Sequence, residues 1–120
     1  MGIITLKTRS EFLRVRGGPR WAGPGFVVEA KLRPQDCAVA GARFGFTVTR
    51  QSGNAVVRNR IRRRLRALVA DLAQEHAMAK CDYVLIARPA AEDRPFALLK
   101  ADLVAAFERV RAGANAKRKA

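Results

Sequence analysis

The stretch GNAVVRNRIRRRLRALVADLA, residues 53–73, decides the fold around it, because its pattern predicts a long helix with two unlike faces. Asn54 is a favourable N-cap residue, and the helix is expected over about residues 55–76. At 3.6 residues per turn, one stripe of this helix is apolar and consists of Val57, Ile61, Leu65, Leu68 and Leu72. Six arginines lie between Arg58 and Arg66, most of them on the other side. One face is therefore expected to seat against a core, and the other is strongly cationic.

The cationic face predicts a polyanionic partner. A face made only for solubility normally mixes charge signs, but no acidic residue occurs between Asp36 and Asp71. Arginines four residues apart repel one another and weaken an isolated helix, so a bound anion would relieve this repulsion. Guanidinium groups also form forked hydrogen bonds with phosphate oxygens and stack on bases.

The whole chain is also basic. Its 120 residues include 24 Lys and Arg against 10 Asp and Glu, which gives a formal net charge of +14. Such a charge attracts nucleic acids or anionic membranes. No apolar run approaches the roughly 20 residues that a membrane span needs, and no secretory signal is readable at the N-terminus. We expect a cytoplasmic protein with no membrane partner.

The sequence before the basic helix favours RNA over DNA as the polyanion. A helix-turn-helix motif needs a partner helix just before the recognition helix, whereas here a strand-like segment ends at a Gly-Asn turn. Recognition helices also carry varied polar side chains for base edges, and this helix offers mainly arginine with the single Asn59. That composition suits contacts with the backbone and shape of a structured RNA.

The remaining segments predict an α+β sandwich, with helices packed against a sheet. Thr8 and Glu11 form a capping-box pattern for a first helix over residues 8–16. The other expected elements are a flexible Gly- and Pro-rich connection over 17–25, a strand at 26–32, one long or two broken strands within 37–50, a turn at 80–82, a strand at 82–88 and a helix from 96 that Gly113 caps. We expect one domain over residues 1–113 and a basic, disordered tail over 114–120.

Few residues suggest that the protein itself catalyses a reaction or binds a metal ion. The two cysteines, Cys37 and Cys81, are far apart and are expected to be reduced thiols, and His76 is the single histidine. We find no histidine pair, no clustered acids for two metals and no activated nucleophile, so no catalytic and no metal-binding residue is assigned.

The flanking motifs narrow the function further. The segment RFGFTVTRQSGNAVVRNRIRRRLRALV, residues 43–69, strongly resembles the signature of the bacterial ribonuclease P protein component, and EFLRV at 11–15 and DYVLIARPAA at 82–91 extend the match to about residues 8–110. The resemblance implies a small α-β sandwich with a four-stranded sheet and three helices in the order α-β-β-β-α-β-α. It also implies a left-handed β-α-β crossover, an exception to the usual handedness.

The resemblance implies a non-catalytic protein subunit of a ribonucleoprotein endonuclease. In this family the RNA subunit is the ribozyme that removes the 5′ leader from precursor tRNA, with Mg²⁺ held mainly by RNA. The protein binds the catalytic RNA and the leader and assists cleavage. The implied partners are therefore the catalytic ribonuclease P RNA and precursor tRNA, with no obligate protein partner.

Site residues follow from the positions that match the family's motifs. The resemblance implies that the catalytic RNA is bound by Arg58, Asn59, Arg60, Arg62, Arg63 and Arg66. It implies that the single-stranded leader runs between the first helix and the sheet, along Phe12, Arg16, Val27, Thr47 and Arg50. Stacking on an aromatic contributes about 1–3 kcal/mol per base with little sequence preference.

This chain departs from the family pattern at three positions that bear on the leader cleft. Arg16 stands where many members have a second aromatic, Glu29 stands where an aromatic often follows FVV, and Gln51 replaces the second residue of a basic pair. Electrostatics would then carry more of the leader contact, with Trp21 as a compensating aromatic. Two alternatives to the ribonuclease P hypothesis stay open from the residues alone: a general RNA-binding or ribosome-associated domain, and a stand-alone nuclease.

Overall fold

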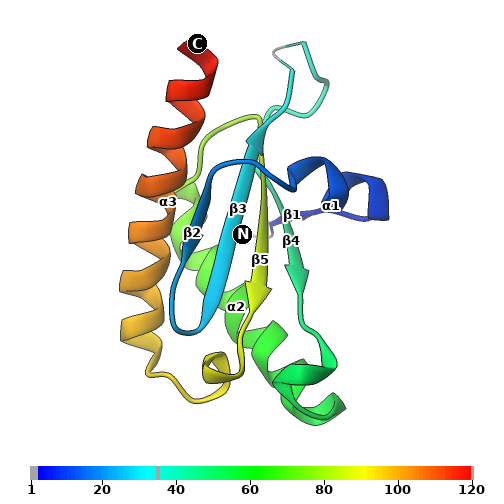
Figure 1. The fold of residues 1–120 in the computed structure, drawn as a ribbon, viewed down its shortest axis with the longest axis vertical. Helices are drawn as coiled ribbons and strands as arrows, with labels where there is room; N and C mark the ends of the chain where they lie inside the picture. Colours follow the sequence, from blue (N-terminus) through cyan, green and yellow to red (C-terminus); the bar gives the residue numbers. More distant parts are fainter. Residues whose placement is uncertain (1–2, 35, 120) are drawn as a thin grey trace.

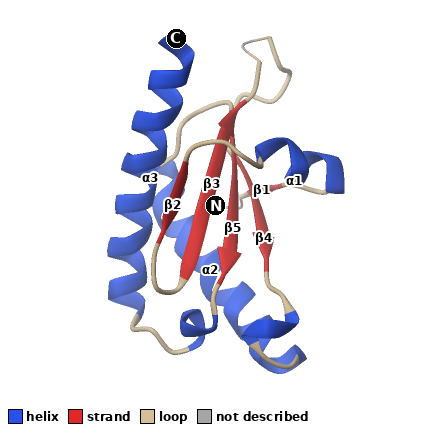
Figure 2. Ribbon diagram, viewed as in Figure 1, coloured by secondary structure: helices blue, strands red, loops and turns tan. Residues whose placement is uncertain are grey.

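The computed structural model describes the backbone of residues 3–34 and 36–119 and the side chains of residues 3–34 and 36–115. In chain order the elements are β1 (Ile4–Thr5), α1 (Arg9–Val15), β2 (Arg20–Ala22), β3 (Phe26–Leu32), β4 (Arg43–Thr47), the 3₁₀ turn η1 (Arg50–Ser52), α2 (Ala55–His76), β5 (Cys81–Ala87), the 3₁₀ turn η2 (Pro89–Glu92) and α3 (Phe96–Lys119). Figure 2 shows the strands as one layer, with helices on both sides.

The strands form one mixed sheet in the order β1-β4-β5-β3-β2. β4 pairs in parallel with β1 and β5, whereas β3 pairs antiparallel with β5 and β2. The α+β class is confirmed, but the expected count of four strands is wrong, because the described sheet has five. The added strand is β1, two residues that pair with β4 before the first helix begins.

The connection from β4 through α2 to β5 has the unusual hand. In Figure 1 both strands point downward, β5 lies to the left of β4, and α2 crosses behind the sheet. This arrangement is a left-handed crossover, as the resemblance implies, whereas nearly all β-α-β connections are right-handed. α1 lies on the front face in this view, so α1 and α2 cover opposite faces of the sheet.

The main core lies between the sheet and the helices α2 and α3. Three aromatic rings meet there: Phe44 stacks on Tyr83 with centroids 5.2 Å apart, and Phe107 of α3 meets Tyr83 edge-on at 5.1 Å. A smaller cluster on the other face includes Val84 of β5 and Val15 of α1. Within the described parts of the chain, no helix is both long and apolar enough to cross a membrane.

The two best-supported helix predictions are confirmed. α2 spans Ala55–His76, and the side chain of Asn54 accepts a hydrogen bond from the amide of Val57 at 3.0 Å. α1 begins with the expected capping box, in which Thr8 accepts from the amide of Glu11 and Glu11 accepts from the amide of Thr8. Local sequence is sufficient for both helix starts, because each cap is made by residues three positions apart.

The strand predictions near the glycine-rich segment need correction. β2 forms within residues 17–25, which sequence predicts as a flexible connection, because it pairs with β3 across a tight turn in which Gly23 donates to the carbonyl of Phe26 at 3.0 Å. Within residues 37–50 only Arg43–Thr47 becomes a strand. The expected turn at 80–82 also differs, since β5 already begins at Cys81.

Gly113 does not cap the last helix. α3 continues through it to Lys119, so residues 114–119 are helical where a disordered tail is expected, and Ala120 lies outside the described residues. A Cβ atom at position 113 would lie 2.9 Å from Cβ of Pro19, so glycine permits the close approach of α3 to the segment before β2. Packing of Ala114, only 4% exposed, further favours the continued helix.

A buried ionic cluster fixes α1 on the sheet. Asp82 is fully buried near the start of β5 and receives guanidinium groups from three different segments. Arg43 on β4 donates from Nε and Nη2 to the two carboxylate oxygens, both at 2.8 Å. Arg14 on α1 donates at 2.8 Å and Arg33, just after β3, at 2.5 Å. The carboxylate therefore joins one helix to three adjacent strands.

Glu11 extends this cluster into the first turn of α1. Its Oε2 atom lies 2.9 Å from Nη1 of Arg43, while Oε1 accepts from the amides of Lys7 and Thr8. These backbone hydrogen bonds, with the Arg43 charge, lower the pKa of Glu11. For Asp82, burial raises the pKa, but hydrogen bonds from the three arginines outweigh it and bring the pKa to about 2.

We expect the protein to lose stability as the pH falls from about 4 to about 2. The folded pKa of Asp82, about 2, lies below its ordinary value of 3.8. The corresponding stabilisation, roughly 2 kcal/mol, is fully present above the ordinary value and disappears as the folded state takes up a proton. Urea unfolding at closely spaced pH values measures this loss.

Substitution should separate this carboxylate from the other acids. Asp82→Asn should cost about 3–5 kcal/mol, because three guanidinium groups then converge on an uncharged amide. The matched control is Asp71→Asn, which removes a half-exposed ion pair with Lys100 and should cost less than about 1 kcal/mol. Equal urea midpoints for these two variants would contradict the role assigned to Asp82.

Candidate nucleic-acid interface

The helix α2 presents its two faces as the sequence predicts. Ile61, Leu65 and Leu68 are fully buried in the main core, and Val57 and Leu72 pack at its margin. The residues expected to contact the catalytic RNA lie on the remaining surface. Asn59, Arg60, Arg63 and Arg66 are exposed, and Arg58 and Arg62 are half-buried.

Tertiary contacts divide the arginines of α2 into two groups. Arg64 points toward the segment between β5 and α3, where it donates to the carbonyls of Ala91 at 2.6 Å, Glu92 at 2.9 Å and Arg94 at 2.5 Å. Arg60 faces the same segment and pairs with the Glu92 carboxylate at 2.8 Å. Arg64 is therefore a structural residue, and the charge of Arg60 is partly compensated.

The charges of the other group of arginines are not compensated by acidic groups of the described residues. Arg58, Arg62 and Arg66 are four residues apart, and among the described side chains no acidic group lies within 4 Å of their guanidinium groups. Arg62 donates to the neutral amide oxygen of Asn59 at 3.1 Å. Arg66 lies over the ring of Phe46, 5.8 Å from its centroid, which places this row beside β4. The row is available to an external anion.

The predicted leader residues lie on the opposite face of the sheet, beside α1. The pairing register places Val27, Ile86 and Thr47 in one row across β3, β5 and β4. The ring of Phe12 lies close above β4, since a Cβ atom at Gly45 would be 2.5 Å from it. Phe12 and Thr47 are half-buried, whereas Val27 is 3% exposed and can only form the floor.

We define the cleft by Phe12, Val27, Thr47 and Ile86, and the two remaining predicted leader residues are cations that follow elements bordering it. Arg16 is the C-cap residue of α1, and Arg50 follows β4 in η1; both are exposed. The structure thus brings Phe12, Val27 and Thr47 together on one side of the sheet, and it places Arg16 and Arg50 shortly after α1 and β4. Ile86 is a cleft residue that sequence analysis misses, although the alternation of DYVLIAR could have placed it on the face opposite Tyr83 and Leu85.

The three departures from the family pattern have different surroundings. Arg16 and Gln51 are exposed, whereas Glu29 is a buried cleft-face residue beside Val84 on one side and Arg20 on the other. Trp21 does not compensate for the missing aromatics. It aligns with Val28 on the opposite face of the sheet and packs against Phe26, 5.7 Å between ring centroids.

The described residues contain no group of three or more His, Cys, Asp or Glu side chains placed to hold a metal ion. Burial raises the pKa of the Cys81 thiol to about 11 and also raises the pKa of Tyr83, so neither is an activated nucleophile. Cys37 is half-buried with its Sγ 3.3 Å from the carbonyl of Val39.

Comparison with known proteins gives one consistent family. A family model described as Ribonuclease P matches residues 4–111. The ribonuclease P protein component of Paramagnetospirillum magneticum is 47% identical over 107 residues, covering 88% of this chain and 80% of that protein. The same component of Gluconacetobacter diazotrophicus is 46% identical over 99 residues, covering 82% and 83%.

Solved structures agree with the sequence relatives. The RNase P protein of Staphylococcus aureus is similar with a TM-score of 0.70 and 27% identity, covering 87% of this chain and 92% of that one. The RNase P protein of Thermotoga maritima is similar with a TM-score of 0.71 over 89% of this chain and 96% of that one. Its identity of 23% supports a common fold alone.

Proposed function

The chain belongs to the bacterial ribonuclease P protein family, and from this premise we propose that its basic helix and its cleft hold two different RNAs. It is the RNA-binding subunit of ribonuclease P, the ribonucleoprotein endoribonuclease that processes the 5′ ends of tRNA. The observation that carries the proposal is that the row of arginines without acidic partners and the cleft lie on opposite faces of one sheet.

The face of α2 binds the catalytic RNA in this proposal. Arg58, Arg62 and Arg66 follow one line along the helix, and like charges at this spacing destabilise the free protein. Phosphate groups of a folded RNA would remove this repulsion and accept forked hydrogen bonds. Asn59, Arg60 and Arg63 complete the proposed contact surface, in which Arg60 must share its charge with Glu92.

The cleft binds the 5′ leader of precursor tRNA. Its apolar floor and the half-buried ring of Phe12 suit an unpaired base, whereas Arg16 and Arg50 suit the phosphates on either side. The groups that line it offer little base-edge discrimination, which fits a partner of variable sequence. Phe12 also packs in the small cluster under α1, so it has a structural and a binding role.

We assign Mg²⁺ to the RNA subunit, because the described residues hold no cluster of acids for a metal ion and several of their acids are engaged by the chain's own cations. Asp82 and Glu11 belong to the buried cluster, and Asp102 pairs with Arg94 at 2.8 Å. Acidic side chains that are already paired with cations of the chain are poor ligands for a tightly bound metal ion. We also propose that the protein is not catalytic alone, needs no obligate protein partner and acts in the cytoplasm.

Reconstitution tests the proposed function. The protein should lower the Mg²⁺ and salt concentrations at which a bacterial ribonuclease P RNA cleaves precursor tRNA, because its cations replace counterions at RNA phosphates. Cleavage rates measured across a Mg²⁺ series, with and without protein, check this. A protein with no effect would be a general RNA binder, and metal-dependent cleavage by RNA-free protein would indicate a stand-alone nuclease.

Two neighbouring arginines should respond differently to the same substitution. Arg62→Ala should weaken binding to the catalytic RNA and make the slope of log affinity against log salt shallower by up to about one unit, with little change in unfolding free energy. Arg64→Ala leaves three carbonyls without their donor and should lower the unfolding free energy by about 1–3 kcal/mol. Filter binding over a salt series and urea unfolding separate the two effects, and an unchanged slope for Arg62→Ala would make it a merely solvated residue.

Phe12→Ala should weaken the holoenzyme's binding to leader-bearing precursor by about 1–3 kcal/mol and its binding to mature tRNA much less. The matched control is Phe96→Ala, because Phe96 is also partly exposed but begins α3 on the other side of the sheet. Equal losses for precursor and mature tRNA would assign Phe12 to packing alone.

A further inference from the structure

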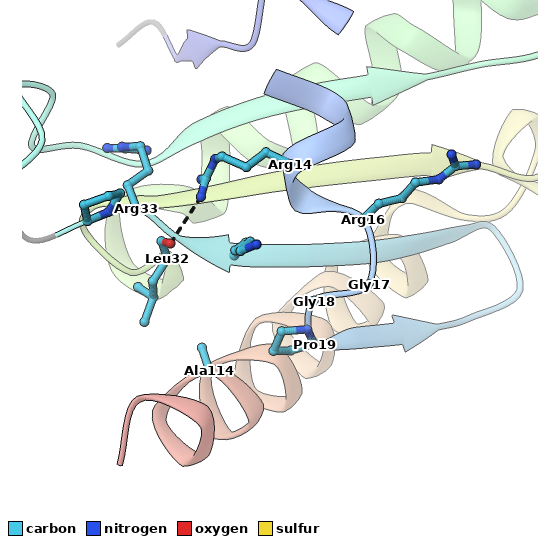
Figure 3. Close-up of a pocket in the computed structure, with 10 residues that line it drawn as sticks. Arg14, Arg16, Gly17, Gly18, Pro19, Leu32, Arg33 and Ala114 are labelled. Atoms are coloured by element: carbon cyan, nitrogen blue, oxygen red, sulfur yellow. Dashed lines mark hydrogen bonds between the residues drawn. The ribbon is translucent and has the colours of Figure 1, made fainter. Parts of the chain in front are cut away.

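A second concavity lies at the C-terminal end of α1. It has a volume of about 520 Å³, within the range of about 300–1,000 Å³ that is typical of small-molecule sites. Figure 3 shows it between the end of α1, the segment leading to β2, the end of β3 and the last turns of α3. It is lined by Arg14, Arg16, Gly17, Gly18, Pro19, Lys31, Leu32, Arg33, Pro34 and Ala114. We call it the α1–α3 cavity.

The cavity and the leader cleft lie at different rows of the sheet, and the ionic cluster borders the cavity. On β5 the cleft row contains Ile86, whereas Lys31, which lines the cavity, aligns with Asp82 four residues away. Phe12, Val27 and Thr47 do not line the cavity. Arg16 is the exception, because it belongs to the predicted leader residues and also lines the cavity. A single strand that passes Arg16 would therefore reach both places.

The charge of the cavity suits a phosphate. Four cationic side chains line it. Arg14 and Arg33 are engaged by Asp82, and Arg33 also donates to the carbonyls of Val39 and Gly41, which leaves Lys31 and Arg16 to attract an anion. Lys31 and Arg16 are exposed, so their charged groups face solvent. In Figure 3 Arg14 turns toward Leu32, whose carbonyl it contacts at 3.4 Å, and Arg16 extends the other way.

The remaining wall suits the sugar and base that accompany a phosphate. It is formed by Pro19, Leu32, Pro34 and Ala114. Ala114 reaches this place only because α3 continues past Gly113 against Pro19. Apolar walls with a few charged groups are the usual composition of a site for a small polar ligand.

We propose that the α1–α3 cavity binds a nucleotide of the 5′ leader that lies farther from the cleavage site than the nucleotides in the cleft. This inference rests on the proposed function, because it extends the same single strand past Arg16. The leader is favoured over the catalytic RNA because the cavity opens beside α1, whereas the proposed face for the catalytic RNA is on α2, across the sheet. Lys31 is the phosphate-binding residue that belongs to the cavity alone.

The test uses the holoenzyme, reconstituted with a bacterial ribonuclease P RNA, and precursor tRNAs with a graded series of leader lengths. Lys31→Ala should lower affinity about fivefold for long leaders and leave affinity for the shortest leaders and mature tRNA unchanged. For long leaders the slope of log affinity against log salt should become shallower by about 0.7, the value for one single-strand phosphate. Lys31→Arg keeps the charge and should restore binding.

The matched control is Lys7→Ala, because Lys7 is also exposed but lies before α1 and does not line the cavity. A loss with Lys31→Ala that is equal at all leader lengths, or absent, or matched by Lys7→Ala, would overturn the inference. So would weaker binding of the protein to the catalytic RNA alone, which would make that RNA the occupant. If Phe12→Ala lowers affinity for leader-bearing precursor more than for mature tRNA while Lys31→Ala has no such effect, the cavity inference fails and the proposed cleft stands.

Discussion

The carboxylate of Asp82 is the point on which the arrangement of this protein depends. A charge without contact with water is costly, and it is tolerated here because Arg14, Arg33 and Arg43 supply hydrogen bonds from α1, the end of β3 and β4. These bonds hold a helix of only seven residues across the sheet. Because α1 is held there, it divides the face into the leader cleft on one side and the ionic cluster with the α1–α3 cavity on the other.

The same physical rule sorts the arginines of this basic chain. Those that find a carboxylate or several carbonyl oxygens within the protein become structural, as Arg64 does on the carbonyls around η2 and Arg43 does on Asp82. Those without such partners have a charge that the protein does not compensate, as Arg62 does on the outer face of α2. The net charge of +14 therefore overstates the number of residues available to RNA, and position within the fold decides which arginines count.

The helices cover the two faces of the sheet unequally. α2 uses its apolar stripe to cover the back of the sheet, so its cationic side faces outward. The front of the sheet is covered only in part, because α1 is short and the apolar cluster beneath it is small. Burial on one face and incomplete cover on the other are the features on which we base the proposal of a structured RNA behind the sheet and a single strand in front.

The sequence by itself determined the features that depend on neighbouring residues: the capping box of α1, the Asn54 cap, the bounds of α2 and its division into apolar and cationic sides. The central motif also indicated the family, and with it a hypothesis for the leader residues. Tertiary structure alone decided the rest. Pairing with β3 made a strand of Arg20–Ala22. α3 continued past Gly113, where glycine permits its close approach to Pro19, and Asp82 became a buried anion where a turn was expected. Each of these depends on a partner distant in the chain, and neither propensity nor periodicity contains information on such a contact.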